Sequence, residues 1–118
     1  MIRVKRVYDA PSAEDGVRIL VDRLWPRGLS KERAGVALWL KEIAPSTELR
    51  QWYRHDPDRW EEICRRYRAE LSARPDLVRT IEEQAARGTV TLLYSSREGE
   101  RNNAVALKMF LERGGGKK

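Results

Sequence analysis

The sequence predicts an α/β fold: a single small domain in which a mostly parallel sheet of about four strands is flanked by helices. Residues 17–22 and 90–94 form short, nearly continuous aliphatic runs, which are typical of strands covered on both faces. Segments with helical spacing of apolar residues lie between these runs and after them. Strands that alternate with helices favour a parallel sheet. Because no linker or repeat interrupts the pattern, we expect one domain over residues 1–113.

Two further strands are predicted in the first third of the chain. Residues 2–7 alternate imperfectly between apolar and basic side chains, which favours a first strand. Residues 9–16 contain proline, serine and glycine and are predicted to form a loop. In residues 36–41, Leu38 and Leu40 alternate with less apolar neighbours. This pattern favours a third strand, although a helix also fits it.

The helices are predicted from capping residues and from the spacing of apolar side chains. The clearest helix has Asp56 as its N-cap and Pro57 at its first position, and its apolar face extends to Leu71. Pro75 separates it from a second helix that Gly88 ends. The other predicted helices are a short turn from Ser30, a short helix from Ser46 and a last helix that carries Val105, Leu107, Phe110 and Leu111.

Composition limits the class of protein and its environment. The chain has 118 residues, of which 36% are charged, and a formal net charge of +6, which favours anionic partners. Cys64 is the single cysteine, so the chain has no internal disulfide, as expected in a reducing compartment. The sequence shows neither a signal peptide nor a membrane span, so we expect a cytoplasmic protein. Residues 114–118 are expected to form a flexible Gly/Lys tail.

The loop after the second predicted strand is the first candidate site. Ligands of parallel sheets bind beyond the carboxyl ends of the strands, where this loop is expected. Guanidinium groups bind phosphate or carboxylate oxygens bidentately, and glycine lets the backbone approach a ligand. The candidate anion-binding residues are Arg23, Arg27, Gly28, Ser30 and Lys31, and Trp25 and Trp39 are the candidate pocket walls. The alternative is a packed corner in which Arg23 pairs with Asp22 or Glu32.

The loop after the last predicted strand is the second candidate. Ser95 and Arg101 have the spacing of the cysteine and arginine in the phosphate loops of cysteine phosphatases. Serine replaces the nucleophilic cysteine here, and the sequence shows no base beside it, which disfavours catalysis. Ser95, Arg97 and Asn103 are therefore predicted to bind an anion opposite the first loop. The alternative is a solvated loop that ends in a helix cap at Asn102 or Asn103.

Other reactive residues give no pattern that predicts a cofactor. His55 is the only histidine, and it lies just before a helix start, where we expect a structural or solvated residue, with a general base as the alternative. Together with Cys64 it has no metal-ligand spacing, so no metal is predicted. Glycine-rich nucleotide fingerprints are missing, and no other cofactor is predicted.

Longer strings resemble a known family. The stretches VDRLWPRG and APSTELRQW are specific, and the match extends over nearly the whole chain. The sequence resembles the YeaO-like branch of domain-of-unknown-function family 488. The resemblance implies a compact α/β domain and no established activity. Longer relatives carry a Cys-His-Arg string after the last strand, where this chain has Ser95 and Asn102, so the resemblance implies no thiol chemistry here.

Three hypotheses for function follow. The first is an anion-binding pocket at the carboxyl-terminal edge of the sheet, with a phosphorylated metabolite or a nucleotide as the ligand. The second is a nucleic-acid-binding accessory protein, and the third is a protein-interaction module for an acidic partner. The sequence leaves open whether the protein is an enzyme and what its oligomeric state is.

Overall fold

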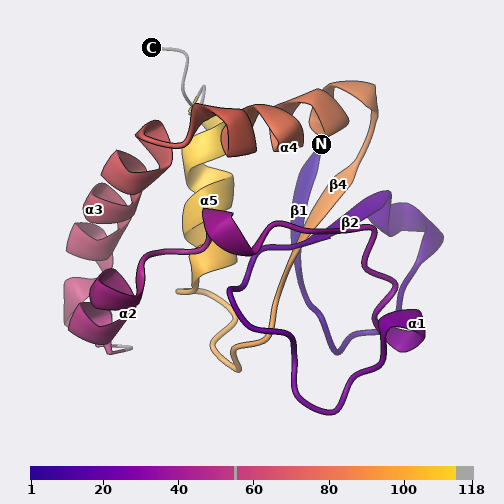
Figure 1. Cartoon of the computed structure of the whole chain (residues 1–118), viewed down its shortest axis with the longest axis horizontal. Helices are drawn as coiled ribbons and strands as arrows, with labels where there is room; N and C mark the ends of the chain where they lie inside the picture. Colours follow the sequence, from indigo (N-terminus) through magenta and orange to yellow (C-terminus); the bar gives the residue numbers. More distant parts are fainter. Residues whose placement is uncertain (55, 114–118) are drawn as a thin grey trace.

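A computed structural model describes residues 1–54 and 56–113 of the chain. Its sheet contains four strands in the order β1-β4-β2-β3, and all three neighbouring pairs are parallel. This arrangement confirms the predicted α/β class. The strands are β1 (Ile2–Arg6), β2 (Val17–Leu20), β3 (Leu38–Trp39) and β4 (Val90–Tyr94) (Figure 1).

In the part of the chain that the structure describes, five α-helices surround the sheet, and polar side chains cap several of them. Ser46 and Asn102 accept hydrogen bonds from backbone N–H groups in the first turns of α2 and α5, as their sequence positions predict. Asp56 caps a short 3₁₀ turn, Pro57–Arg59, that leads directly into the helix that the sequence predicts most clearly. The helices are α1 (Lys31–Ala34), α2 (Thr47–Tyr53), α3 (Trp60–Ser72), α4 (Pro75–Arg87) and α5 (Asn103–Glu112).

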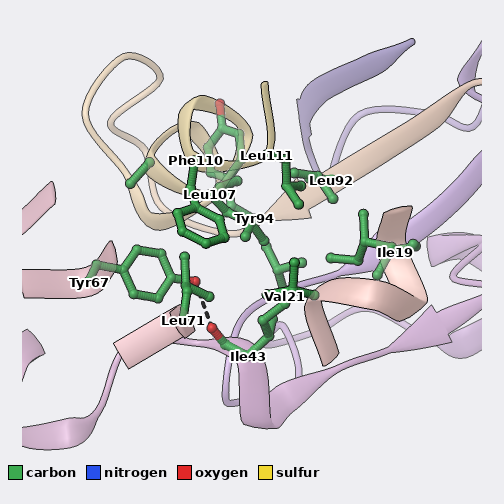
Figure 2. Packing of buried hydrophobic residues seen from close by; sticks show 14 of the residues in the cluster. Ile19, Val21, Ile43, Tyr67, Leu71, Leu92, Tyr94, Leu107, Phe110 and Leu111 are labelled. Carbon is green, nitrogen blue, oxygen red and sulfur yellow. Dashed lines mark hydrogen bonds between the residues drawn. The ribbon is translucent and has the colours of Figure 1, made fainter. Parts of the chain in front are cut away.

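The main hydrophobic core lies on the face of the sheet that α3, α4 and α5 cover. Successive residues of a strand point to opposite faces, so Leu92 and Tyr94 enter this core while Leu93 enters a smaller cluster on the other face. Figure 2 shows the packing of β2 and β4 side chains against α3 and α5, with Tyr67 donating a hydrogen bond to the carbonyl of Ile43. The sheet is therefore covered on both faces, as the continuous aliphatic runs predict.

The second face carries a buried ionic network. Asp15 is 1% exposed and Arg18 is 4% exposed. Arg18 Nη1 lies 2.6 Å from Asp15 Oδ2, and the Arg18 guanidinium also donates to the carbonyl of Ala34. Lys5 Nζ donates to the same carboxylate. Each buried charge therefore has partners, and the network joins β1, β2 and α1.

The third strand is much shorter than the predicted range 36–41. Only Leu38–Trp39 pairs as a strand, and a 3₁₀ turn follows at Lys41–Ile43. Leu40 leaves the extended region, with a ψ of 68°, and the turn places Ile43 in the main core with no exposed surface. The strand ends early because the chain turns to bury Ile43 in the core. The periodicity of the sequence does not indicate this turn.

Some expectations lie outside the described residues. These are the role of His55 and the flexible tail at residues 114–118. No helix within residues 1–54 and 56–113 is long and apolar enough to cross a membrane.

Candidate functional site

A cleft of about 1120 Å³ lies beyond the carboxyl ends of β1, β2 and β4. The loops that follow β2 and β4 both contribute to its lining, as the parallel sheet predicts. The end of β1, the segment before α2 and the helices α2, α3 and α5 provide the rest of the lining. In Figure 1, the segments that follow β1 and β4 turn at the lower edge of the sheet. The two candidate loops therefore meet in one cleft.

Arginine dominates the charged lining of this cleft. Among the lining residues that the structure describes, there are six arginines and a single carboxylate, Asp22. Four of the arginines make no side-chain hydrogen bond or ion pair with any residue in ranges 1–54 and 56–113, and all four are exposed. These four are Arg27, Arg50, Arg97 and Arg101. Their guanidinium groups are available for bidentate binding of phosphate or carboxylate oxygens.

Arg23 has local partners, but not those of the packed-corner alternative. Its Nη2 donates to the carbonyl of Ala44 at 3.2 Å, and its Nη1 lies 3.5 Å from a carboxylate oxygen of Glu42. Neither Asp22 nor Glu32 pairs with it. Its Nε is buried and has no hydrogen-bond acceptor among the described residues. Arg23 thus fixes the loop to the segment before α2, while the Arg27 guanidinium makes no such contact with the part of the chain that the structure describes.

The end of β1 contributes two residues that the sequence interpretation missed. Arg6 donates to the carbonyls of Ser95 and Ser96, at 3.1 and 3.0 Å. Its guanidinium lies 4.9 Å from the ring centroid of Tyr8, and the Tyr8 hydroxyl donates to the carbonyl of Arg27. These contacts join the two candidate loops. Because β1 is parallel to β2 and β4, its carboxyl end was the signal that could have identified both residues.

Asp22 binds the polar groups of the β4–α5 loop. Its Oδ2 accepts hydrogen bonds from the backbone N–H and the hydroxyl of Ser95, at 2.9 and 2.8 Å. Its Oδ1 accepts from the side-chain amide of Asn103 at 3.0 Å. That amide also donates to the carbonyl of Val21. Two predicted anion-binding residues, Ser95 and Asn103, therefore lie at the cleft with these donors bound to an internal carboxylate.

The two predicted wall residues differ in position. Trp25 lines the cleft, and its ring lies edge-on to that of Trp39, with a centroid distance of 5.4 Å. Trp39 lies outside the lining and donates its indole N–H to the carbonyl of Asp22. The Lys41 ammonium lies over the Trp39 ring, 5.2 Å from its centroid. Trp39 therefore supports the loop, and Trp25 forms the wall.

Three other predicted residues lie outside the cleft lining: Gly28, Ser30 and Lys31. Gly28 has a φ of +75°, a left-handed conformation that favours glycine at the turn. Ser30 accepts a hydrogen bond from the Arg33 N–H and so caps α1, which has only four residues. These residues shape the loop, and the arginines before them line the cleft.

Apolar and aromatic groups complete the lining. Tyr53 of α2 and Trp60 and Ile63 of α3 line the cleft, and burial raises the pKa of the Tyr53 hydroxyl. Tyr53 and Trp60 lie with their ring centroids 6.2 Å apart. Cys64 lies outside the cleft, half-buried on α3, where burial raises its thiol pKa. Within the described ranges, no three His, Cys, Asp or Glu side chains form a cluster that could hold a metal ion.

Comparisons with known proteins give a family. Residues 1–115 match the DUF488-N3i model, described as the inactive DUF488-N3 subclade. The uncharacterised protein YeaO of Escherichia coli K12 is 40% identical over 110 residues, which cover 93% of this chain and 96% of YeaO. The uncharacterised protein Rv3073c of Mycobacterium tuberculosis H37Rv is also 40% identical over 110 residues, 93% of this chain and 92% of the relative. No solved structure matches. The chain therefore belongs to domain-of-unknown-function family 488, as a YeaO-like member.

Proposed function

We propose that this protein binds a phosphorylated metabolite or a nucleotide in the cleft at the carboxyl-terminal edge of the sheet, in the cytoplasm. One observation carries the proposal: six arginines line the described part of the cleft, with a single carboxylate among them. That carboxylate, Asp22, already accepts hydrogen bonds from Ser95 and Asn103. The guanidinium groups of Arg27, Arg50, Arg97 and Arg101 make no ion pair with a residue in ranges 1–54 and 56–113, so an anionic ligand would supply their counter-charge.

The spread of the arginines favours a ligand with more than one acidic oxygen group. Arg27 comes from the loop after β2, Arg50 from α2, and Arg97 and Arg101 from the loop after β4. A cleft of about 1120 Å³ is also much larger than a single phosphate ion requires. The aromatic rings of Tyr8, Trp25 and Trp60 in the lining suit a ligand with a flat or apolar part. A nucleotide has both features.

We further propose that the cleft binds its ligand without converting it. The matched subclade is described as inactive, and we extend that description to this chain. Ser95 is the residue at the position of the cysteine in phosphatase loops, and its hydroxyl is held by Asp22 at 2.8 Å. The single cysteine, Cys64, lies outside the lining.

Calorimetry with the purified full chain tests the proposal. The titrants are AMP, ADP, ribose 5-phosphate and inorganic phosphate, each at two salt concentrations. Arg27→Ala and Arg101→Ala should each weaken binding by about tenfold or more, because each removes a charged donor from the ligand. The matched control is Arg87→Ala, an exposed arginine at the end of α4, near the amino-terminal ends of the strands. It should leave affinity unchanged.

Two outcomes would contradict the proposal. One is the absence of binding to every phosphorylated titrant. The other is an equal loss of affinity in Arg87→Ala and Arg27→Ala, which would indicate general attraction to a positive protein. Tight binding of a long polynucleotide, with affinity that falls steeply with salt, would instead support the nucleic-acid hypothesis.

A further inference from the structure

The β4–α5 loop presents a set of donors in a half-buried part of the cleft, which we call its deep end because the arginines Arg27, Arg97 and Arg101 in the lining are exposed. The backbone N–H and the hydroxyl of Ser95 point to one acceptor atom, Asp22 Oδ2, at 2.9 and 2.8 Å. The amide of Asn103 donates to the other oxygen at 3.0 Å. Asn103 is also the first residue of α5, a ten-residue helix whose amino-terminal end lies at the cleft. Three donors from two chain segments thus converge on one carboxylate.

Donors of these types also bind oxyanions. A loop between a strand and a helix, with free N–H groups and a helix dipole behind it, is a general anion-binding arrangement. In this chain, the anion that meets the donors is part of the protein. Asp22 reaches them from the end of β2, 73 residues earlier in the sequence than Ser95.

We propose that Asp22 is an internal counter-anion that occupies these donors and excludes the ligand's acidic group from the deep end of the cleft. The ligand's acidic group then binds at the outer arginines Arg27, Arg97 and Arg101. This inference deepens the proposed function, and it determines which part of the cleft selects the ligand. Simple oxyanions bind weakly because the groups that would enclose them are already bound to Asp22.

The test measures the affinity of the full chain for inorganic phosphate. Asp22→Ala should raise it by about tenfold or more, since one charge-assisted hydrogen bond contributes about that factor. Removing any nearby negative charge also raises anion affinity, so the matched control is Glu100→Gln, an exposed carboxylate on the same loop outside the lining. This control should change affinity by no more than about twofold, because exposed charges are screened.

Ser95→Ala distinguishes the released donors from a general charge effect. In the Asp22→Ala background it should remove most of the gain, because the freed hydroxyl no longer binds phosphate. In the otherwise unchanged chain it should leave phosphate affinity within about twofold, because that hydroxyl is already bound to Asp22. This second measurement tests the inference even where Asp22→Ala does not fold.

The results separate the inference from the proposed function. Equal gains of phosphate affinity in Asp22→Ala and Glu100→Gln would overturn the inference. A loss of phosphate affinity well above about twofold in Ser95→Ala, with Asp22 in place, would also overturn it. No gain in folded Asp22→Ala, with nucleotide binding through the arginines intact, would overturn the inference alone. If Asp22→Ala gains affinity for inorganic phosphate while the unchanged chain binds none of the phosphorylated titrants, the proposed function is overturned and the role of Asp22 is supported.

Discussion

Replacing Asp15 with asparagine removes the negative charge at the centre of the buried ionic network. The Asp15 carboxylate accepts hydrogen bonds from Arg18 at 2.6 Å, from Lys5 at 3.0 and 3.2 Å, and from the backbone N–H of Ser12 at 3.0 Å. Arg18 is 4% exposed, so water cannot take the place of the lost charge. The substitution therefore leaves a buried guanidinium without its counter-ion.

The structure gives a magnitude and a matched control for this change. Breaking a buried ion pair by removing one partner costs about 3–5 kcal/mol, and we expect Asp15→Asn to lower the free energy of unfolding by about 3 kcal/mol. Asp76 and Arg79 form an ion pair at the same spacing, three residues apart, but with side chains that are 93% and 61% exposed. Asp76→Asn should therefore cost less than about 1 kcal/mol.

The effect of Asp15→Asn should also depend on pH. Burial raises the pKa of the Asp15 carboxyl, but hydrogen bonds from Lys5, Arg18 and Ser12 outweigh burial and hold the pKa below its usual value of 3.8. A carboxyl whose pKa is lower in the folded state stabilises the fold fully above its unfolded pKa. The stabilisation is lost as the pH falls through the folded pKa. The difference between the two proteins should thus be greatest near neutral pH and shrink below pH 3.8.

Urea denaturation followed by circular dichroism measures both effects. The free energy of unfolding is determined for the unchanged chain, Asp15→Asn and Asp76→Asn at pH 7, and for the first two down to pH 3. Equal losses for the two substitutions would refute the assignment of Asp15 and Arg18 to a buried, coupled pair. A loss from Asp15→Asn that does not shrink in acid would show that the charge of Asp15 does not stabilise the fold.

Three further substitutions test the packing. Tyr67→Phe removes the hydroxyl that donates to the buried carbonyl of Ile43, and it should lower the free energy of unfolding by about 1–2 kcal/mol in the same urea assay; no change would contradict that hydrogen bond. Trp25→Ala should cost about 2–3 kcal/mol, below the 3–5 of a fully buried aromatic residue because Trp25 is half-buried; a change under 0.5 kcal/mol, typical of surface residues, would refute its packing role. Cys64→Ala should leave ligand affinity unchanged, and thiol reagents should label Cys64 slowly because burial raises its pKa; rapid labelling of the native protein would contradict this environment.

The fold class, and the edge of the sheet at which the candidate site lies, follow from local patterns in the sequence. The runs at residues 17–22 and 90–94 are local signals of buried strands, and β2 and β4 lie within them. Helical spacing and caps such as Ser46 are local as well. Once the strands are parallel, their carboxyl ends must share an edge, so the loops that carry Arg27 and Arg97 were expected to meet there, and both line the cleft.

Which side chains meet, and which of their donors are already bound, depends on contacts between segments far apart in the chain. Asp22 binds Ser95 across 73 residues, and Arg6 reaches the same loop across 89. Whether Asp15 and Arg18 are solvated or buried depends on the layer that covers the second face of the sheet. β3 is short because Ile43 is buried in the core, and this burial depends on α3 and α4, which lie beside the Lys41–Ile43 turn. Periodicity and spacing describe near neighbours along the chain, whereas hydrogen-bond partners and burial arise from segments that only folding brings together.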